Sequence, residues 1–128
     1  MVKVNNVDHI DIVVQDLEGY AKLLEGLGFK VISRTAHRGG AVEMQLPGPN
    51  QTILEFHQQQ EGMALGVAHI AIGVDDVRAF YQEWSKKGIE FDREPHEVKV
   101  TGRVLTNIKD MGGCTIQVSD SRREAPES

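Results

Sequence analysis

The sequence predicts an α+β fold made of two tandem βαβββ modules. Three observations predict it: the two halves of the chain repeat each other, each half opens with a strand of alternating apolar residues, and an amphipathic helix preceded by an aspartate follows each of these strands. The repeats cover about residues 5–58 and 65–120 of a single domain, 1–128. Residues 121–128 have no apolar anchor, so we expect a frayed tail there.

The internal repeat can be read by aligning the two halves directly. The stretch around His9 matches the stretch around His69 without gaps, at an offset of 69 − 9 = 60 residues. Toward the end of each half the offset is 117 − 55 = 62 residues and pairs Glu55 with Gln117. The loop 93–101 is the natural place for the two additional residues, because surface loops accept insertions at small cost.

The first repeat begins with residues 7–14, which alternate between apolar and other side chains with the period of two of a half-buried strand. Asp16 is placed to accept from the free amides of a first helical turn, and Gly28 stands where a left-handed C-cap would end the helix. The strands expected after this helix start at Phe29 and cover 42–46 and 51–57.

The second repeat has the same order of elements. Residues 67–74 alternate in the same way, Asp76 stands before the second helix and Gly88 follows it. The strands expected after this helix start at Ile89 and cover 103–108 and 114–119. Four aromatic residues fall on the apolar faces of the two helices and are expected in the core: Tyr20, Phe80, Tyr81 and Trp84.

Composition excludes several classes of protein. The 14 Lys and Arg against 19 Asp and Glu give a net charge of −5 without any basic run, which argues against a nucleic-acid partner. No apolar run approaches the roughly 20 residues of a membrane span. Cys114 is the single cysteine, so no internal disulfide is possible and a cytoplasmic location is the default. A small molecule is the expected partner.

Four polar residues occupy equivalent places in the two repeats. His9 and His69 lie in the first strands, Glu55 and Gln117 lie in the last strands, and each stands on the less apolar face of its strand. If the modules pair about a pseudo-twofold axis, their strands form a curved mixed sheet with the helices outside, and these four side chains converge in its concavity. Asp11 is a candidate for orienting one of them.

Two imidazoles, a carboxylate and a carboxamide form a ligand set for a divalent cation. Zn²⁺, Ni²⁺, Co²⁺, Mn²⁺ or Fe²⁺ would suit these donors and keep positions open for water or substrate, which indicates catalysis. The competing interpretation is that a histidine in an alternating strand is a satisfied structural residue, and that Gln117 bonds a water or the rim. The recurrence of histidine at both repeat positions favours the metal.

Other polar residues carry weaker hypotheses. Histidines without an equivalent in the other repeat are expected at the surface: His37, His57 and His96. Three arginines are candidates for holding an anionic group but are expected to be solvated: Arg34, Arg38 and Arg103. Cys114 has no activating partner in the sequence and is expected to be a small packing residue.

At these motifs the sequence resembles the vicinal oxygen chelate superfamily, the group of glyoxalases, bleomycin-resistance proteins and extradiol dioxygenases. The resemblance rests on Val7-Asp8-His9-Ile10, Val14 with Asp16-Leu17, Leu27-Gly28-Phe29, His69-Ile70-Ala71-Ile72 and Asp75-Asp76-Val77. The turn Lys109 to Gly113 is similar to the family's turn before its last strand, from which Met111 and Gly112 depart. It implies a paired βαβββ fold, commonly in a homodimer, with a divalent metal held at His9, Glu55, His69 and Gln117. The family usually has Glu in the fourth place, so Gln117 is a departure.

The resemblance implies a metal-dependent lyase or isomerase of the glyoxalase type. Such an enzyme transfers a proton next to a carbonyl through a metal-stabilised enediolate, and Glu55 is the candidate to carry the proton. The alternative from another class is a metal-free small-molecule or antibiotic-binding protein of the bleomycin-resistance type.

Three further activities of the family remain as alternatives. Gln117 weakens an extradiol-type dioxygenase and a thiol transferase acting on fosfomycin, since both would have an acid at that position. A methylmalonyl-CoA epimerase resembles a mirrored version of this chain, with Gln in the first half and Glu in the last.

Overall fold

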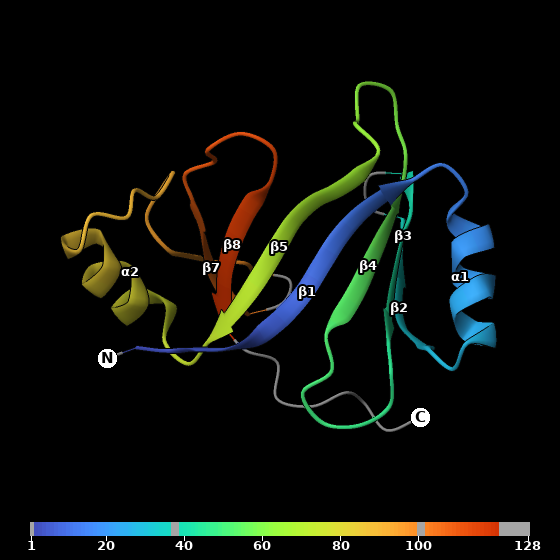
Figure 1. Ribbon diagram of the computed structural model, residues 1–128, viewed down its shortest axis with the longest axis horizontal. Coiled ribbons are helices and arrows are strands. Elements are labelled where there is room, and N and C mark those ends of the chain that lie inside the picture. Colours follow the sequence, from blue (N-terminus) through green and yellow to red (C-terminus); the bar gives the residue numbers. More distant parts are fainter. Residues whose placement is uncertain (1, 37–38, 100–101, 121–128) are drawn as a thin grey trace. The chain divides into compact units, whose positions relative to one another are not determined.

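The computed structural model describes residues 2–36, 39–99 and 102–120, so the predicted frayed tail, 121–128, lies outside the described residues. The elements follow the predicted order, strand-helix-strand-strand-strand twice, and confirm the α+β class (Figure 1). They are β1 (Val4–Val14), α1 (Leu17–Gly26), β2 (Lys30–Thr35), β3 (Ala41–Gln45), β4 (Ile53–Gln58), β5 (Gly66–Val74), α2 (Val77–Lys86), β6 (His96–Glu97), β7 (Val104–Ile108) and β8 (Thr115–Asp120).

The chain divides into two compact units. We call residues 9–68 the first-repeat unit, and residues 2–8 with 69–120 the second-repeat unit, so the start of β1 is grouped with the second repeat. None of the helices in the described ranges combines the length and apolarity that a membrane-crossing helix needs.

In the first-repeat unit the strands are ordered β2-β3-β4-β1. β1 pairs with β4 in parallel, and the other neighbours are antiparallel. The helix α1 packs on one face of these strands, where its buried side chains Leu17 and Ala21 meet a core that includes Val42, Met44 and Phe56. Because side chains alternate along a strand, the neighbours of these core residues point away from α1.

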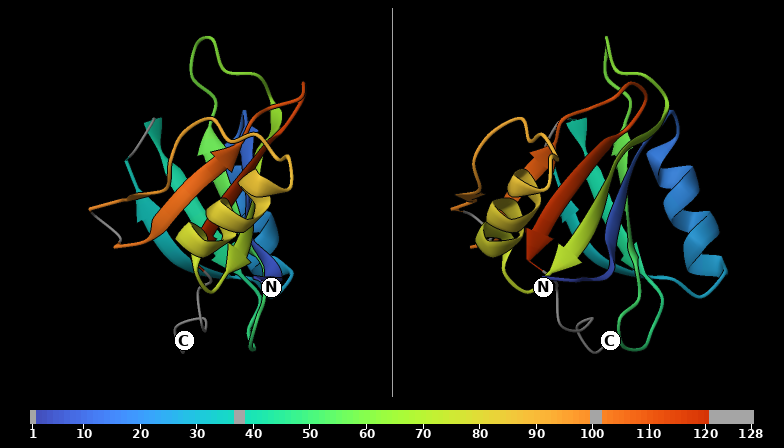
Figure 2. Two further views of the ribbon diagram at one scale, coloured as in Figure 1. Left: turned by 90° about the vertical axis from the view of Figure 1, so that its left-hand side faces the viewer. Right: turned by 60° about the vertical axis from the view of Figure 1, so that its left-hand side comes forward.

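In the second-repeat unit the strands are ordered β5-β8-β7-β6, with β5 and β8 parallel. Figure 2 shows α2 lying across its own strands. The buried core joins α2 to β5 and β8 through Val74, Val77, Phe80 and Val118. Val2 packs against this core, and its backbone N–H donates to a Glu83 carboxylate oxygen at 2.8 Å.

Both helices begin and end as the sequence predicts. The Asp16 Oδ1 accepts from the backbone N–H of Gly19 at 2.9 Å, and the Asp76 Oδ1 accepts from that of Ala79 at 3.0 Å. Each carboxylate therefore satisfies an amide that the helix itself leaves without a partner. Beyond the helix ends, Gly28 has φ +105°, a left-handed conformation that a side chain would strain.

Two local predictions were wrong. The Tyr20 ring was expected in the core but is 44% exposed, because it covers the edge of the core by stacking on Phe56 at 5.6 Å between ring centroids. The return strand expected from Ile89 is absent over 89–95, where Phe91 makes a single bridge to Ile108; the short β6 comes later.

Candidate metal and proton-transfer site

The parallel pairing of β1 with β4 gathers four polar side chains on the face turned away from α1. In the register, Asp11 is the partner of Glu55. His9 stands two residues before Asp11 on β1, and His57 stands two residues after Glu55 on β4, so all four side chains share one face. His9, Asp11 and His57 are buried, and Glu55 is half-buried. The first-repeat unit therefore holds a dense polar group against one side of its sheet.

His9 and Glu55, the two ligands predicted in this unit, are close enough to share an ion. The Nε2 of His9 lies 4.0 Å from the Oε1 of Glu55. Two ligand atoms that each sit about 2.1 Å from one cation can be at most about 4.2 Å apart. The donor types and their separation thus fit a divalent metal.

His57 contradicts the expectation that it lies at the surface. Only 4% of its side chain is exposed, and its Nε2 lies 3.0 Å from the Oδ2 of Asp11 and 3.5 Å from the Oε2 of Glu55. Asp11, Glu55 and His57 form a group whose ligand atoms are themselves close enough to hold a cation. Glu55 directs its two oxygens toward different imidazoles, Oε1 toward His9 and Oε2 toward His57.

The two carboxylates control the charge of His57. Its interaction with Asp11, and next its interaction with Glu55, raise the pKa of the imidazole from 6.5 to about 9, against the opposing effect of burial. His57 is therefore an imidazolium at neutral pH. Its positive charge compensates the carboxylates that the strands bury beside it.

The sequence contains the signal that locates these partners. Residues two apart on a strand share a face, so Asp11 follows His9, and His57 follows Glu55, on the predicted ligand face. In the sequence, Asp11 is a candidate for orienting a ligand, whereas histidines are singled out as ligands only where they recur in both repeats. That criterion excluded His57, because the equivalent position at the offset of 62 residues is Ser119.

The structure adds a further carboxylate that the sequence interpretation did not consider. Glu43 on β3 is the antiparallel register partner of Glu55 on β4, and its side chain is half-buried. Directly opposed residues on neighbouring strands point to the same face. Two glutamates therefore lie side by side on this face, and Glu55 is the one whose carboxylate lies near His9.

The second-repeat unit carries the other two predicted ligands on its parallel strand pair. His69 lies on β5 and Gln117 on β8, where Gln117 is the register partner of Ala71. The His69 and Gln117 side chains are both half-buried. That they join His9 and Glu55 around one ion stays a prediction.

Arg103 is engaged within the fold. Arg103, expected to be solvated, has a side chain only 16% exposed that lies 2.9 Å from the Oδ2 of Asp8. Its Nη2 also donates to the Ser119 Oγ at 2.8 Å and to the backbone carbonyl of Asp120. Arg103 is thus a structural cation of the second-repeat unit, while Arg38 lies outside the described residues.

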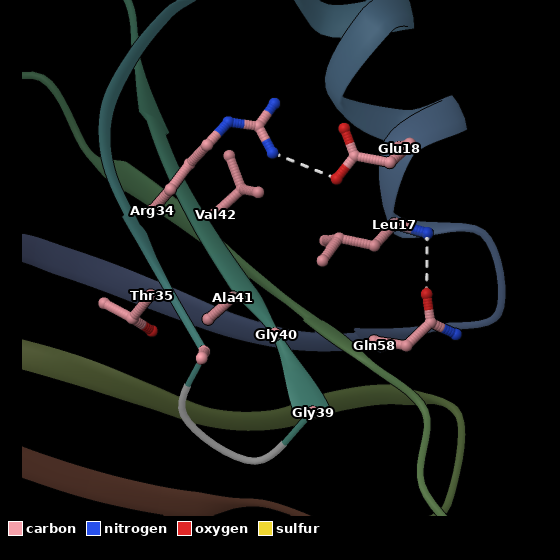
Figure 3. A pocket seen from close by; sticks show the side chains of 10 residues that line it. Leu17, Glu18, Arg34, Thr35, Gly39, Gly40, Ala41, Val42 and Gln58 are labelled. Atoms are coloured by element: carbon pink, nitrogen blue, oxygen red, sulfur yellow. Dashed lines mark hydrogen bonds and ion pairs between the residues drawn. The ribbon is translucent and has the colours of Figure 1, made fainter.

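An open pocket of about 480 Å³ lies at the start of α1, on the other side of the first-repeat unit (Figure 3). Three of its polar side chains already have partners within the fold: Glu18, Arg34 and Gln58. Arg34 donates to the Glu18 carboxylate at 2.9 Å, and the Gln58 Oε1 accepts from the backbone N–H of Leu17 at 3.2 Å. The pocket offers no ligand set comparable to the group around Glu55.

Comparison with known proteins assigns the family. The family model described as the Glyoxalase/Bleomycin resistance protein/Dioxygenase superfamily matches residues 6–118. The chain belongs to this superfamily. Members of the superfamily typically bind divalent metal ions, and the first-repeat unit holds histidine and glutamate side chains that could be ligands. A search of curated proteins finds no significant match.

Solved structures with the same fold include several epimerases. The methylmalonyl-CoA epimerase of Streptomyces coelicolor, in complex with 2-nitronate-propionyl-CoA, is 23% identical with a TM-score of 0.72, over 97% of this chain and 100% of that one. The Mycobacterium tuberculosis epimerase is 20% identical with a TM-score of 0.71, over 93% and 89% of the two chains. A hypothetical protein from Bacillus halodurans C-125 is 20% identical with a TM-score of 0.73, over 98% and 100%. At these identities the likeness establishes the fold.

Proposed function

We propose that this protein is a metal-dependent isomerase or lyase that transfers a proton at a carbon next to a carbonyl group, with Glu55 as the proton carrier. The observation that carries the proposal is the position of the Glu55 carboxylate, whose Oε1 faces His9 across 4.0 Å. His9, Glu55 and His69 are the proposed ligands, and Gln117 is the proposed fourth. A divalent cation bound by them would polarise the substrate carbonyl and increase the acidity of the adjacent C–H bond.

The pair of glutamates favours isomerase chemistry over lyase chemistry. Inversion at a carbon needs one group to remove a proton and another to return a proton from a different direction. Glu43 and Glu55 are direct partners in the β3–β4 register, so two carboxylates lie side by side on the ligand face. The half-burial of both side chains keeps them accessible to a bound substrate.

The fold likeness suggests the class of substrate to test first. The structural neighbours include epimerases solved with methylmalonyl-CoA and with 2-nitronate-propionyl-CoA. We therefore propose an acyl-CoA thioester with an acidic hydrogen next to its carbonyl. The expectation of a homodimer also stays a prediction, and light scattering of the purified protein tests it.

Two measurements test the function. Elemental analysis of the native protein should find a divalent metal that His9→Ala and His69→Ala reduce, and equal metal content in all three proteins would remove the proposed site. In D₂O, NMR should detect enzyme-dependent exchange of the hydrogen next to the carbonyl of methylmalonyl-CoA. Glu55→Gln should abolish the exchange, and Glu43→Gln should slow exchange and inversion.

A metal-free binding protein is the competing outcome. It would bind a small molecule with the same affinity before and after treatment with a chelator, and would catalyse no exchange. Either result alone would argue against the enzymatic proposal, and the two together would establish the binding class.

A further inference from the structure

We propose that His57, anchored by Asp11, is a positioning residue that holds the Oε2 of Glu55 and so directs the Oε1 of Glu55 toward His9. This inference rests on the proposed metal site, whose ligand Glu55 is the group being positioned. It adds His57 on β4 to the site and gives Asp11 on β1, a candidate for orienting a ligand on sequence grounds, a specific partner.

The geometry separates the two sides of the Glu55 carboxylate. The Nε2 of His57 lies 3.5 Å from Oε2, whereas the Nε2 of His9 lies 4.0 Å from Oε1. A glutamate has three rotatable side-chain torsions, so contact at one oxygen restricts where the other can point. Restriction of this kind favours a ligand that uses one oxygen, since the other is already engaged.

Asp11 fixes the imidazole that performs this restriction. Its Oδ2 lies 3.0 Å from the same Nε2, and 5% of its side chain is exposed against 4% for His57. Both side chains are therefore shielded from water, so water does not replace the contact between them. The parallel strands also fix the spacing, because Asp11 is the register partner of Glu55 and Val13 is that of His57.

The absence of this arrangement from the second repeat supports a role specific to Glu55. At the positions equivalent to Asp11 and His57 the chain has Ala71 and Ser119, and there the ligand candidate is the neutral Gln117. Ser119 is buried and accepts from Arg103 instead. The chain thus places the Asp11–His57 pair beside the charged candidate ligand, whereas Ala71 and Ser119 occupy the equivalent positions beside the neutral one.

Titration with Co²⁺ tests the proposal, with binding followed by the visible absorption of the ion. Wild-type protein should bind one Co²⁺ per chain. His57→Leu should weaken binding about 10- to 100-fold, the usual effect of removing a group that orients a metal ligand. His57→Gln, which retains an N–H donor at a similar reach, should stay within about threefold of wild type and keep its absorption spectrum.

Two further variants complete the design. Asp11→Asn, which keeps the imidazole but removes its anchoring charge, should give an intermediate loss. His96→Leu is the matched control, a half-buried histidine on β6, and should leave Co²⁺ binding unchanged. Circular dichroism establishes that each variant is folded before titration.

Several results would overturn the proposal. Equal affinity of His57→Leu and wild type would do so, as would an equal loss in His57→Leu and His57→Gln. Binding of two Co²⁺ per wild-type chain, with one lost in His57→Leu, would make Asp11, Glu55 and His57 a metal site of their own.

A metal-free measurement separates this proposal from the proposed function. In protein treated with a chelator, the imidazole ¹⁵N resonances of His57 should shift in Glu55→Gln and Asp11→Asn but not in His96→Leu. If wild-type protein binds no Co²⁺, the proposed metal site fails. The ¹⁵N spectrum still shows whether His57 contacts Glu55 and Asp11. Unchanged His57 resonances in both variants would overturn the positioning role.

Discussion

Replacement of Arg103 by Met should destabilise the protein through Asp8. The guanidinium lies 2.9 Å from an Asp8 carboxylate whose side chain is 1% exposed. Removal of one partner of a buried ion pair typically costs about 3–5 kcal/mol, because the remaining charge stays in a medium of low polarity. Since 16% of the Arg103 side chain is exposed, we expect the lower end, about 3 kcal/mol.

The expected change in melting temperature follows from the length of the chain. Unfolding entropy of about 2.1 cal/mol/K per residue gives about 0.27 kcal/mol/K for a chain of this size, so a loss of about 3 kcal/mol lowers Tm by about 11 °C. Asp8→Asn should lower the free energy of unfolding by about 2 kcal/mol. The double variant should lose about 3 kcal/mol rather than the additive value of about 5, because Asp8→Asn removes the buried charge that Arg103→Met leaves uncompensated.

Urea unfolding of chelator-treated protein provides the assay. Trp84 is the single tryptophan and lies on α2 in the same unit, so its fluorescence reports the unfolding of the region that Arg103 supports. Lys109→Met is the matched control, since Lys109 pairs with Glu90 at 3.2 Å while both side chains are more than half exposed. Its cost should stay below about 1 kcal/mol.

The reasoning would be refuted by additive losses in the double variant or by a cost in Arg103→Met as small as that in Lys109→Met. A normal Tm together with loss of binding to an anionic ligand would instead favour the hypothesis that Arg103 binds substrate. That outcome would require the contact with Asp8 to contribute little to folding.

The remaining predictions concern pH, the core and a helix cap. The folded-state pKa of His57 is about 9 and its ordinary value is 6.5, so its contribution to stability is complete below pH 6.5 and is lost as the pH rises through about 9. The melting temperature of the metal-free protein should therefore fall between pH 6.5 and about 9, and it should fall less in His57→Gln. Met44→Ala should cost about 2–5 kcal/mol in urea unfolding, because Met44 is fully buried under α1; a loss below about 1 kcal/mol would mean that the core is not packed as described. Asp76→Ala should cost about 0.5–2 kcal/mol by removing the acceptor for the Ala79 amide, and an unchanged urea midpoint would contradict that cap.

Both helices and most strands could be predicted because their determinants are local. Asp16 and Asp76 precede their helices, and the period of two in β1 and β5 is visible without knowledge of any partner strand. The return strand expected after Gly88 does not form, because its formation does not depend on local sequence alone. Strand formation there depends on pairing with β7, and the register supports only the Phe91 bridge and the short β6.

The site was predicted in part because repetition identifies residues but not their neighbours. His9 and Glu55 are singled out by their equivalents in the second repeat, and their side chains lie 4.0 Å apart within the first-repeat unit, while their role as metal ligands stays a prediction. His57 has no equivalent, and its burial results from the β1–β4 register, which brings it to Asp11. Arg103 was misjudged for the same reason, since its partner Asp8 is 95 residues away in the sequence and only the fold brings them together.

The differences between the repeats follow the charge of each candidate ligand. A half-buried carboxylate such as Glu55 needs a compensating charge when no cation is bound, and His57 supplies one at 3.5 Å. A neutral carboxamide such as Gln117 has no such requirement, which is consistent with alanine and serine at the positions of Asp11 and His57. Gln117→Glu would therefore place a half-buried carboxylate where alanine and serine, rather than Asp11 and His57, occupy the neighbouring positions. We expect this substitution to destabilise the metal-free protein, and divalent metal to restore more stability to the variant than it adds to wild type; equal stabilisation of both proteins would argue against Gln117 as a ligand.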